Sequence, residues 1–167
     1  MNSKKISLLF VMFLLAFGAM AQSPLGKGGS QLNAGVGFSN WGLPVYVGLD
    51  FGVHPDITLG GELSFRSYGE NYNKVKYNHT LIGIYGNANY HFNSILQIPR
   101  NWDLYLGLNV GFVIWNSPSD YDGSHNSGLG LGAQLGTRYY FTNRFGLNLE
   151  LGGLGFNGGK FGISYKL

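Results

Sequence analysis

Charged side chains that could do chemistry recur at alternate positions of segments that are otherwise apolar. Within 145–151, for example, Phe145 and Leu147 fall on one face and Glu150 on the other. Such alternation is typical of a β-strand, because successive side chains of a strand point to opposite faces. The charges predicted to share the polar faces are Asp50, Glu62, Arg66, Arg138, Glu150, Lys160 and Lys166.

Three of these charges are predicted to meet. Counting from the turns that flank 145–151 places Arg138 and Lys166 near Glu150, at most one diagonal step away. Two cations beside one carboxylate favour its ionised form and supply the hydrogen-bond donors that a confined polar interior requires. We therefore predict an Arg138–Glu150–Lys166 cluster. Its role is either mutual neutralisation, which is the simpler interpretation, or a gated or selective ion path.

Other catalytic or metal-binding patterns are weak in this sequence. Asp50 and Glu62 could approach each other across a turn, but both lie among polar residues, so electrostatic lining is a better interpretation than paired-acid catalysis. The chain has no cysteine, and its histidines are too scattered for a metal site defined by spacing. They are His54, His79, His91 and His125. The sequence thus predicts no metal, no cofactor and no disulfide.

The alternation recurs in eight segments, each about long enough to cross a bilayer as a tilted strand. Apolar side chains occupy one face of every segment and polar side chains the other. The economical geometry is a closed barrel with the apolar face towards lipid. We predict an all-β fold, an eight-stranded antiparallel up-and-down transmembrane β-barrel. Its expected strands are 31–39, 45–53, 57–66, 82–92, 104–114, 129–141, 145–151 and 160–167.

An even number of strands brings both ends of the barrel to one side of the membrane, which is expected to be the periplasm. The loops expected on the outer side are Asn40–Gly42, Tyr68–Tyr77, Asn116–Ser127 and Gly155–Gly159. Glycines at many inward positions leave room for large side chains at others, so the interior is expected to be packed or narrowly hydrated. The tyrosines expected to lie across it are Tyr46, Tyr85, Tyr105 and Tyr140.

Aromatic residues gather where the strands meet the loops. Their rings favour both lipid–water interfaces of a membrane protein, although aromatic residues also favour strands in general. We therefore predict two lipid-facing girdles. The outer one comprises Trp41, Tyr68, Tyr77 and Trp115, and the inner one Phe92, Trp102, Tyr139, Phe141, Phe145 and Tyr165.

The N-terminus has the three parts of a secretory signal. Two lysines precede an apolar run over 6–18, and a small-residue tripeptide ends at Ala21. The apolar run is shorter than a membrane-spanning helix needs. The predicted divisions are a signal peptide over 1–21 cleaved between Ala21 and Gln22, a short periplasmic segment over 22–30 and a barrel domain over 31–167.

The composition favours a membrane protein over a soluble or nucleic-acid-binding one. Charged residues make up 11% of the chain, whereas a soluble domain carries about 25%. The formal net charge of +3 comes without clusters of lysine or arginine, so the sequence predicts no nucleic-acid partner. A secreted chain with this pattern is expected in the cell outer membrane of a Gram-negative bacterium.

Several stretches carry a resemblance to a known family. They are 32–38, 45–52, 107–111 and 161–167. With them the chain resembles the small outer-membrane barrels of the OmpA transmembrane-domain and OmpX kind, and more narrowly the porin-family "outer membrane protein beta-barrel domain" proteins common in Bacteroidetes. The resemblance implies contact with outer-membrane lipid and lipopolysaccharide, and insertion by the barrel assembly machinery. Leu167 departs from the aromatic residue that usually ends such barrels.

The expected function is non-enzymatic: an integral outer-membrane barrel contributing to envelope structure or surface interaction, with an extracellular ligand as a candidate partner of 68–77 and 116–127. One alternative is a narrow porin-like channel for ions or small solutes. Another is a lipid A-modifying enzyme, because His125 and Ser127 resemble the His-x-Ser element of outer-membrane lipid A deacylases. No acid follows that pair until Glu150, which is predicted to face inward. A soluble lipocalin-like carrier would need an apolar interior.

Overall fold

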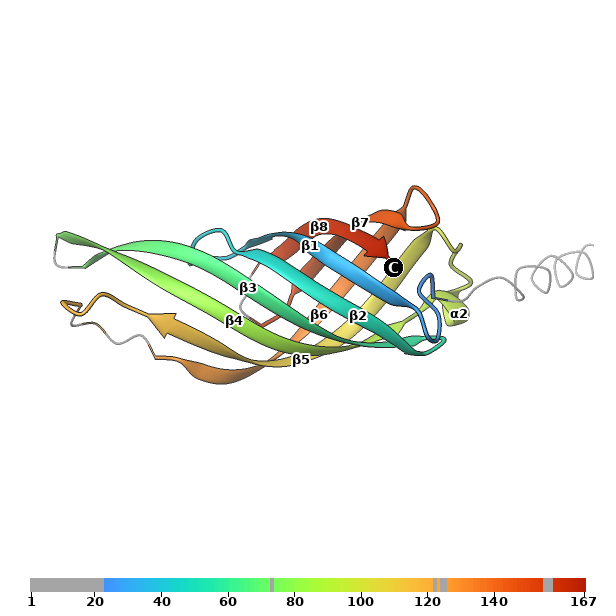
Figure 1. Cartoon of the computed structure of the whole chain (residues 1–167), viewed down its shortest axis with the longest axis horizontal. Helices are drawn as coiled ribbons and strands as arrows, with labels where there is room; N and C mark the ends of the chain where they lie inside the picture. Colours follow the sequence, from blue (N-terminus) through green and yellow to red (C-terminus); the bar gives the residue numbers. More distant parts are fainter. Residues whose placement is uncertain (1–22, 73, 122, 124–125, 155–157) are drawn as a thin grey trace, which may run out of the picture.

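A closed antiparallel β-barrel forms the molecule (Figure 1). The computed structural model describes residues 23–72, 74–121, 123, 126–154 and 158–167. Each strand pairs with its neighbours in sequence, and β1 pairs with β8 to close the sheet. The predicted eight-stranded up-and-down barrel is confirmed. Its elements are β1 (Ser30–Phe38), β2 (Val45–His54), β3 (Ile57–Tyr72), β4 (Val75–His91), α2 (Asn93–Leu96), β5 (Trp102–Asn116), β6 (Gly128–Tyr140), β7 (Phe145–Gly152) and β8 (Gly159–Lys166).

The polarity of the barrel is inverted relative to that of a soluble protein. In β2, Val45 and Val47 are exposed on the outer surface, whereas Tyr46 and Asp50 are buried inside. The same alternation follows from the period of two in the other strands. Leu108 in β5 is 69% exposed, yet its neighbour Asn109 is buried. An apolar outer wall and a polar interior are what a lipid environment requires.

The two ends of the barrel differ in construction. We call the end with the connections 55–56, 92–101 and 141–144 the turn end, and the opposite end, with 39–44, 73–74, 117–127 and 153–158, the loop end. The start of β1 and the end of β8 lie at the turn end, where α2 also lies (Figure 1). The segment 23–29 is held there, since Gly28 N–H donates to Gly52 O at 2.7 Å and Gly52 N–H to Gly29 O at 2.9 Å.

The predicted loop Tyr68–Tyr77 was wrong. β3 runs to Tyr72 and β4 starts at Val75, so the two strands form a long hairpin that projects from the loop end (Figure 1). The backbone pairing continues past the apolar residues, with Tyr68 opposite His79 and Glu70 opposite Tyr77. Strand lengths matched to the bilayer alone miss this extension, because strand pairing persists in water.

A short helix lies in one connection at the turn end. The connection predicted over 93–101 contains the single turn of α2. Ser94 there donates a hydrogen bond to Asp56, which ties the β4–β5 connection to the β2–β3 connection. Within the described residues, no helix is long and apolar enough to cross a membrane. The predicted signal peptide 1–21 and its cleavage before Gln22 lie outside the described residues.

Glycine makes room for the tyrosines that cross the interior. A Cβ at Gly83 would stand 2.0 Å from the Tyr85 hydroxyl, and one at Gly136 would stand 2.2 Å from the Tyr105 ring. Tyr85 and Tyr105 are buried, as are Tyr46 and Tyr140. The predicted packing of tyrosine against small residues is confirmed, and it fills much of the barrel.

A lysine in the middle of the outer wall should destabilise the barrel. Leu108→Lys places an ammonium on the lipid face near the middle of β5, so folding into lipid vesicles should lose about 2–4 kcal/mol. Leu43→Lys is the matched control, because Leu43 is 58% exposed but lies in the 39–44 connection. Its loss should stay below about 1 kcal/mol. Urea titration of both variants measures the difference, and equal losses would contradict a lipid-facing outer wall.

Candidate functional site

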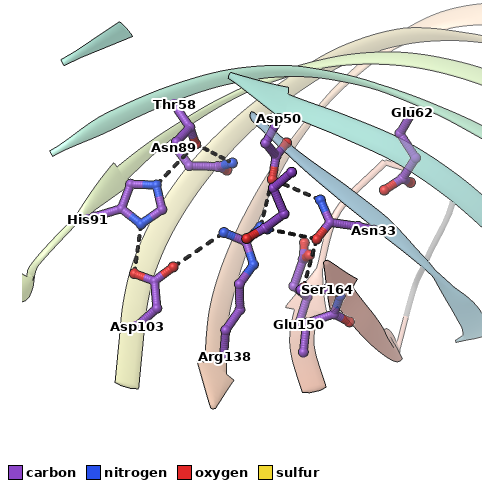
Figure 2. Close-up of polar contacts among 12 residues, drawn as sticks. Asn33, Asp50, Thr58, Glu62, Asn89, His91, Asp103, Arg138, Glu150 and Ser164 are labelled. Carbon is purple, nitrogen blue, oxygen red and sulfur yellow. Dashed lines mark hydrogen bonds and ion pairs between the residues drawn. The ribbon is translucent and has the colours of Figure 1, made fainter. Parts of the chain in front are cut away.

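Arg138 forms the centre of the polar interior. It projects from β6, is 2% exposed, and donates from Nη2 to Asp50 Oδ2 at 2.7 Å. Its Nη1 donates to Asp103 Oδ2 at 3.2 Å. The guanidinium also stacks over Tyr105, 4.3 Å from the ring centre. Figure 2 shows the arginine between the two carboxylates. One cation of β6 thus connects β2, across the lumen, with the neighbouring strand β5.

A histidine extends this cluster. His91 Nδ1 lies 2.7 Å from Asp103 Oδ1, and His91 Nε2 lies 3.0 Å from Thr58 Oγ1 (Figure 2). A hydroxyl, an imidazole and a carboxylate in this order are the contacts of a nucleophile–base–acid triad. Here Thr58 is 1% exposed, His91 0% and Asp103 1%. A substrate cannot reach a hydroxyl buried to that degree, so the arrangement acts as a polar crosslink of the wall.

A second cluster is built around Lys160 of β8. Its ammonium pairs with Glu62 of β3, and lies 3.3 Å from Glu150 Oε2 of β7. It also stands 4.9 Å from the centre of the Tyr46 ring. Each buried cation of the central lumen therefore lies between two carboxylates, which offsets the cost of removing these charges from water.

The predicted Arg138–Glu150–Lys166 cluster was wrong in its partners. Arg138 does lie opposite Asn148, as expected. However, β7 and β8 pair symmetrically about their connection, which places Lys160 opposite Glu150. Lys166 lies near the turn end instead, with its Nζ 3.9 Å from the centre of the Tyr140 ring.

Asp50 and Glu62, interpreted from the sequence as electrostatic lining, do lie near each other, since Asp50 is opposite Gly60 and Glu62 is opposite Gly48 in the β2–β3 register. Asp50 is bound by Arg138 and Glu62 by Lys160, so the two carboxylates belong to separate clusters. Asp103 was missed by the sequence analysis. The signal for it was present, because Asp103 shares the inward parity of Tyr105 in β5.

Neutral side chains join the two clusters to the wall. Asn33 Nδ2 donates to Asp50 Oδ2 at 2.9 Å, and Ser164 donates to Asn33 Oδ1 at 2.7 Å. Gln134 Nε2 donates to Asn89 Oδ1 at 2.9 Å. Together with the ion pairs, these contacts reach every strand of the barrel. The cavity left between the clusters has a volume of about 10 Å³, room for about one water molecule.

The outer girdle prediction was wrong, because three of its four members face inward. Tyr68 has the inward parity of Arg66 in β3, Tyr77 that of His79 in β4, and Trp115 that of Tyr105 in β5. These rings and their neighbours gather on the inner side of the strands at the loop end. We call this set the aromatic mouth; it consists of Trp41, Tyr68, Tyr77, His79, Trp115 and Tyr121.

Close ring contacts hold the aromatic mouth together. The centre of the His79 ring lies 4.6 Å from that of Tyr121 and 5.7 Å from that of Trp115. Trp41 contacts Trp115 edge to face at 5.7 Å. His79 is buried, whereas Trp41 is exposed. The rings therefore pack around a buried histidine and leave a tryptophan exposed at the edge of the set.

Polar contacts anchor the connections of the loop end to this mouth. Ser117 Oγ lies 2.9 Å from His79 Nδ1, and the Tyr121 hydroxyl donates to Glu70 Oε2 at 3.0 Å. Arg66 Nη1 donates to Ser39 Oγ at 2.8 Å. Arg66, predicted as a member of the lumen charge cluster, thus binds the 39–44 connection.

The aromatic residues of the turn end lie on the outer surface. The rings of Trp102 and Tyr139 are 4.7 Å apart, and those of Tyr139 and Phe141 are 5.1 Å apart. Phe145 continues the row next to Phe141, with ring centres 6.4 Å apart. The other predicted members are placed similarly: Phe92 contacts Tyr90 at the end of β4, and Tyr165 is exposed on β8.

The remaining candidate chemistry gains no support from the geometry. Ser127 Oγ accepts a hydrogen bond from the Trp115 backbone N–H at 2.9 Å, while His125 lies outside the described residues. Among the residues that the structure describes, no group of three histidine, aspartate or glutamate side chains could hold a metal ion.

Comparison with known proteins identifies the kind of barrel. A family model described as "Outer membrane protein beta-barrel domain" matches residues 9–165. The structure is similar to the N-terminal β-barrel domain of Pseudomonas aeruginosa OprF, with 18% identity, a TM-score of 0.52, and coverage of 85% of this chain and 99% of that one. OprG from the same organism gives 11% identity, a TM-score of 0.59, and 87% and 99% coverage.

A third similar structure is Ail of Yersinia pestis, solved in complex with the heparin analogue sucrose octasulfate. It gives 13% identity, a TM-score of 0.52, and coverage of 84% of this chain and 99% of that one. Identities this low establish the fold alone. No curated protein matches the sequence.

Removing the central cation should destabilise the barrel strongly. Arg138→Met leaves Asp50 and Asp103 buried without their shared counter-ion, so the free energy of unfolding should fall by about 3–5 kcal/mol. Arg144→Met is the control, because Arg144 is exposed in the connection after β6 and its loss should change little. Urea unfolding in lipid vesicles compares the two. A similar small effect of both substitutions would contradict a structural role for the Arg138 cluster.

Proposed function

The chain belongs to the family of outer membrane protein β-barrel domains, and from this premise we propose that it is a closed, non-enzymatic barrel that strengthens the outer membrane and interacts with the cell surroundings through its loop end. The observation that carries the proposal is the lumen. Its charges are bound to one another across the barrel, and the space between them is about 10 Å³. A lumen so filled serves as a structural core.

The lengths of the connections at the two ends indicate how the barrel is oriented in the membrane. Barrels of the outer membrane have short turns in the periplasm and longer loops outside. The turn end has the shorter β2–β3 and β6–β7 connections, and the loop end has the long β3–β4 hairpin. We propose that the turn end faces the periplasm, that residues 1–21 act as a signal peptide, and that it is cleaved between Ala21 and Gln22.

The proposed surface interaction involves the hairpin and the 117–127 connection. Trp41 is exposed at the rim of the aromatic mouth, and an exposed tryptophan suits a polar partner that also offers an apolar face. Lys74 and Lys76 are exposed on the hairpin, with Asp120 exposed on the neighbouring connection. This mixture of signs favours contact with lipopolysaccharide phosphates at separate points. A continuous polyanion such as the heparin analogue bound by Ail would require a larger cationic surface.

Two features support the absence of catalysis. The Thr58–His91–Asp103 arrangement is almost wholly buried. Ser127 is held by the Trp115 backbone in a strand-end contact. Lipid A from cells that express the protein should therefore have the same mass as lipid A from cells that do not. A mass shift by one acyl chain would contradict the proposal and restore the deacylase alternative.

A narrow channel is the second candidate, because many polar and charged side chains line the lumen. The closed network predicts that the purified barrel in planar bilayers is almost electrically silent. Glu150→Ala should remain silent too, since Lys160 keeps its pair with Glu62 and Tyr46 stays in place. Steady open steps from the wild-type protein would contradict the closed barrel. Heat-dependent migration of both proteins on gels verifies that they are folded.

A further inference from the structure

A cavity of about 630 Å³ lies at the turn end of the barrel, outside the two charge clusters. It is bounded by the segment 23–26, the connection before β5 and the connection after β6. Tyr140 separates it from the lumen, and its hydroxyl donates a hydrogen bond to Gln31 inside the barrel. The polar groups that line it include Ser23, Arg100, Asn101, Thr142, Asn143 and Lys166. Its volume is that of a site for a small molecule.

Lys166 brings a half-buried positive charge to this cavity without an anionic partner. In the part of the chain that the structure describes, no ion pair is formed by its ammonium, which rests over the Tyr140 ring. Asp103 attracts Lys166 electrostatically, but its two carboxylate oxygens are already bound by His91 and Arg138. A cation held partly away from water gains most from an anion that enters the same space.

A second unsatisfied group lies in the wall of the same cavity, covered by its neighbours. Ser23 is 5% exposed, and its hydroxyl has no hydrogen-bond partner among the described residues. A buried hydroxyl without a partner is destabilising, and an acceptor that enters the cavity beside Ser23 would relieve that cost. The residues Thr142 and Asn143 bring further donors, and Arg100 brings a second cationic side chain to the lining.

The neighbourhood indicates which anion fits. Several donors and two cationic side chains around one space suit a phosphate, which offers several oxygens to separate donors. Tyr139 and Phe141 of the outer aromatic row also line the cavity. The site therefore borders the level at which lipid headgroups meet the barrel.

We propose that this turn-end cavity binds a phosphate ester, with Lys166 as the charged anchor and Ser23 as a hydrogen-bond donor. Two sources share this chemistry: a soluble glycerol phosphate and the headgroup of phosphatidylglycerol. The site is distinct from the aromatic mouth and from the lumen clusters. Its existence does not depend on whether the barrel is closed or conducting.

The test uses the whole mature protein in detergent micelles, with backbone amide NMR shifts as the readout. Titration with glycerol 3-phosphate should move the amides of residues 23, 25, 26, 140–143 and 166 in a saturable way. Lys166→Gln should weaken binding about tenfold, the effect of losing one charge-assisted hydrogen bond. Ser23 lies outside the barrel strands, and Ser23→Ala should weaken phosphate-ester binding by a smaller factor. Arg144→Gln is the matched control, because Arg144 is an exposed cation of the same end that does not line the cavity, and this variant should bind as the wild type does.

A second arm distinguishes the source. The protein in nanodiscs of phosphatidylcholine is compared with the protein in nanodiscs that also contain phosphatidylglycerol. Shifts at the turn end with phosphatidylglycerol alone support a lipid headgroup, and shifts with glycerol 3-phosphate support a soluble ester. Equal affinity of the wild type and Lys166→Gln for both probes, absence of binding to either, or shifts confined to the loop end would overturn the proposal. Gel migration before and after heating shows that each variant is folded.

Discussion

The structure depends on one constraint: a backbone inside lipid must find all its hydrogen-bond partners within the protein. Closure of β1 onto β8 meets that requirement, because it removes the two free edges that an open sheet of these strands would expose. Closure then divides the side chains into an outer and an inner set. The outer set meets lipid and is apolar, and the inner set is confined with little water and must satisfy its own charges.

Confinement explains why the lumen is organised around two cations. Arg138 lies between Asp50 and Asp103, and Lys160 between Glu62 and Glu150. One aromatic ring also contacts each cation, Tyr105 for Arg138 and Tyr46 for Lys160. Buried ion pairs are often no more stabilising than apolar packing, but the loss of one partner is costly. The clusters therefore tie the strands together across the lumen, and the space left between them is about 10 Å³.

The two ends of the barrel differ in where their aromatic and polar side chains lie. At the loop end, the β3–β4 hairpin and the 117–127 connection carry rings over the lumen, with His79 at their centre. At the turn end, aromatic residues lie on the outside, and a polar cavity opens beside Lys166. An aromatic cluster at one end and a polar cavity at the other thus give the barrel two chemically different ends.

The sequence by itself determined the barrel. The alternation of apolar and polar residues that indicates each strand is a local pattern, which neighbouring residues display without any knowledge of distant contacts. It also determined the parity of Arg138, Glu150 and the four lumen tyrosines. It could not determine that Lys160 meets Glu62 or that Arg138 meets Asp50, since these partners are 98 and 88 residues apart. It also placed Tyr68 and Trp115 on the wrong face, because their strands continue past the bilayer with inward parity. Closure and register decide such contacts, and both are properties of the whole sheet.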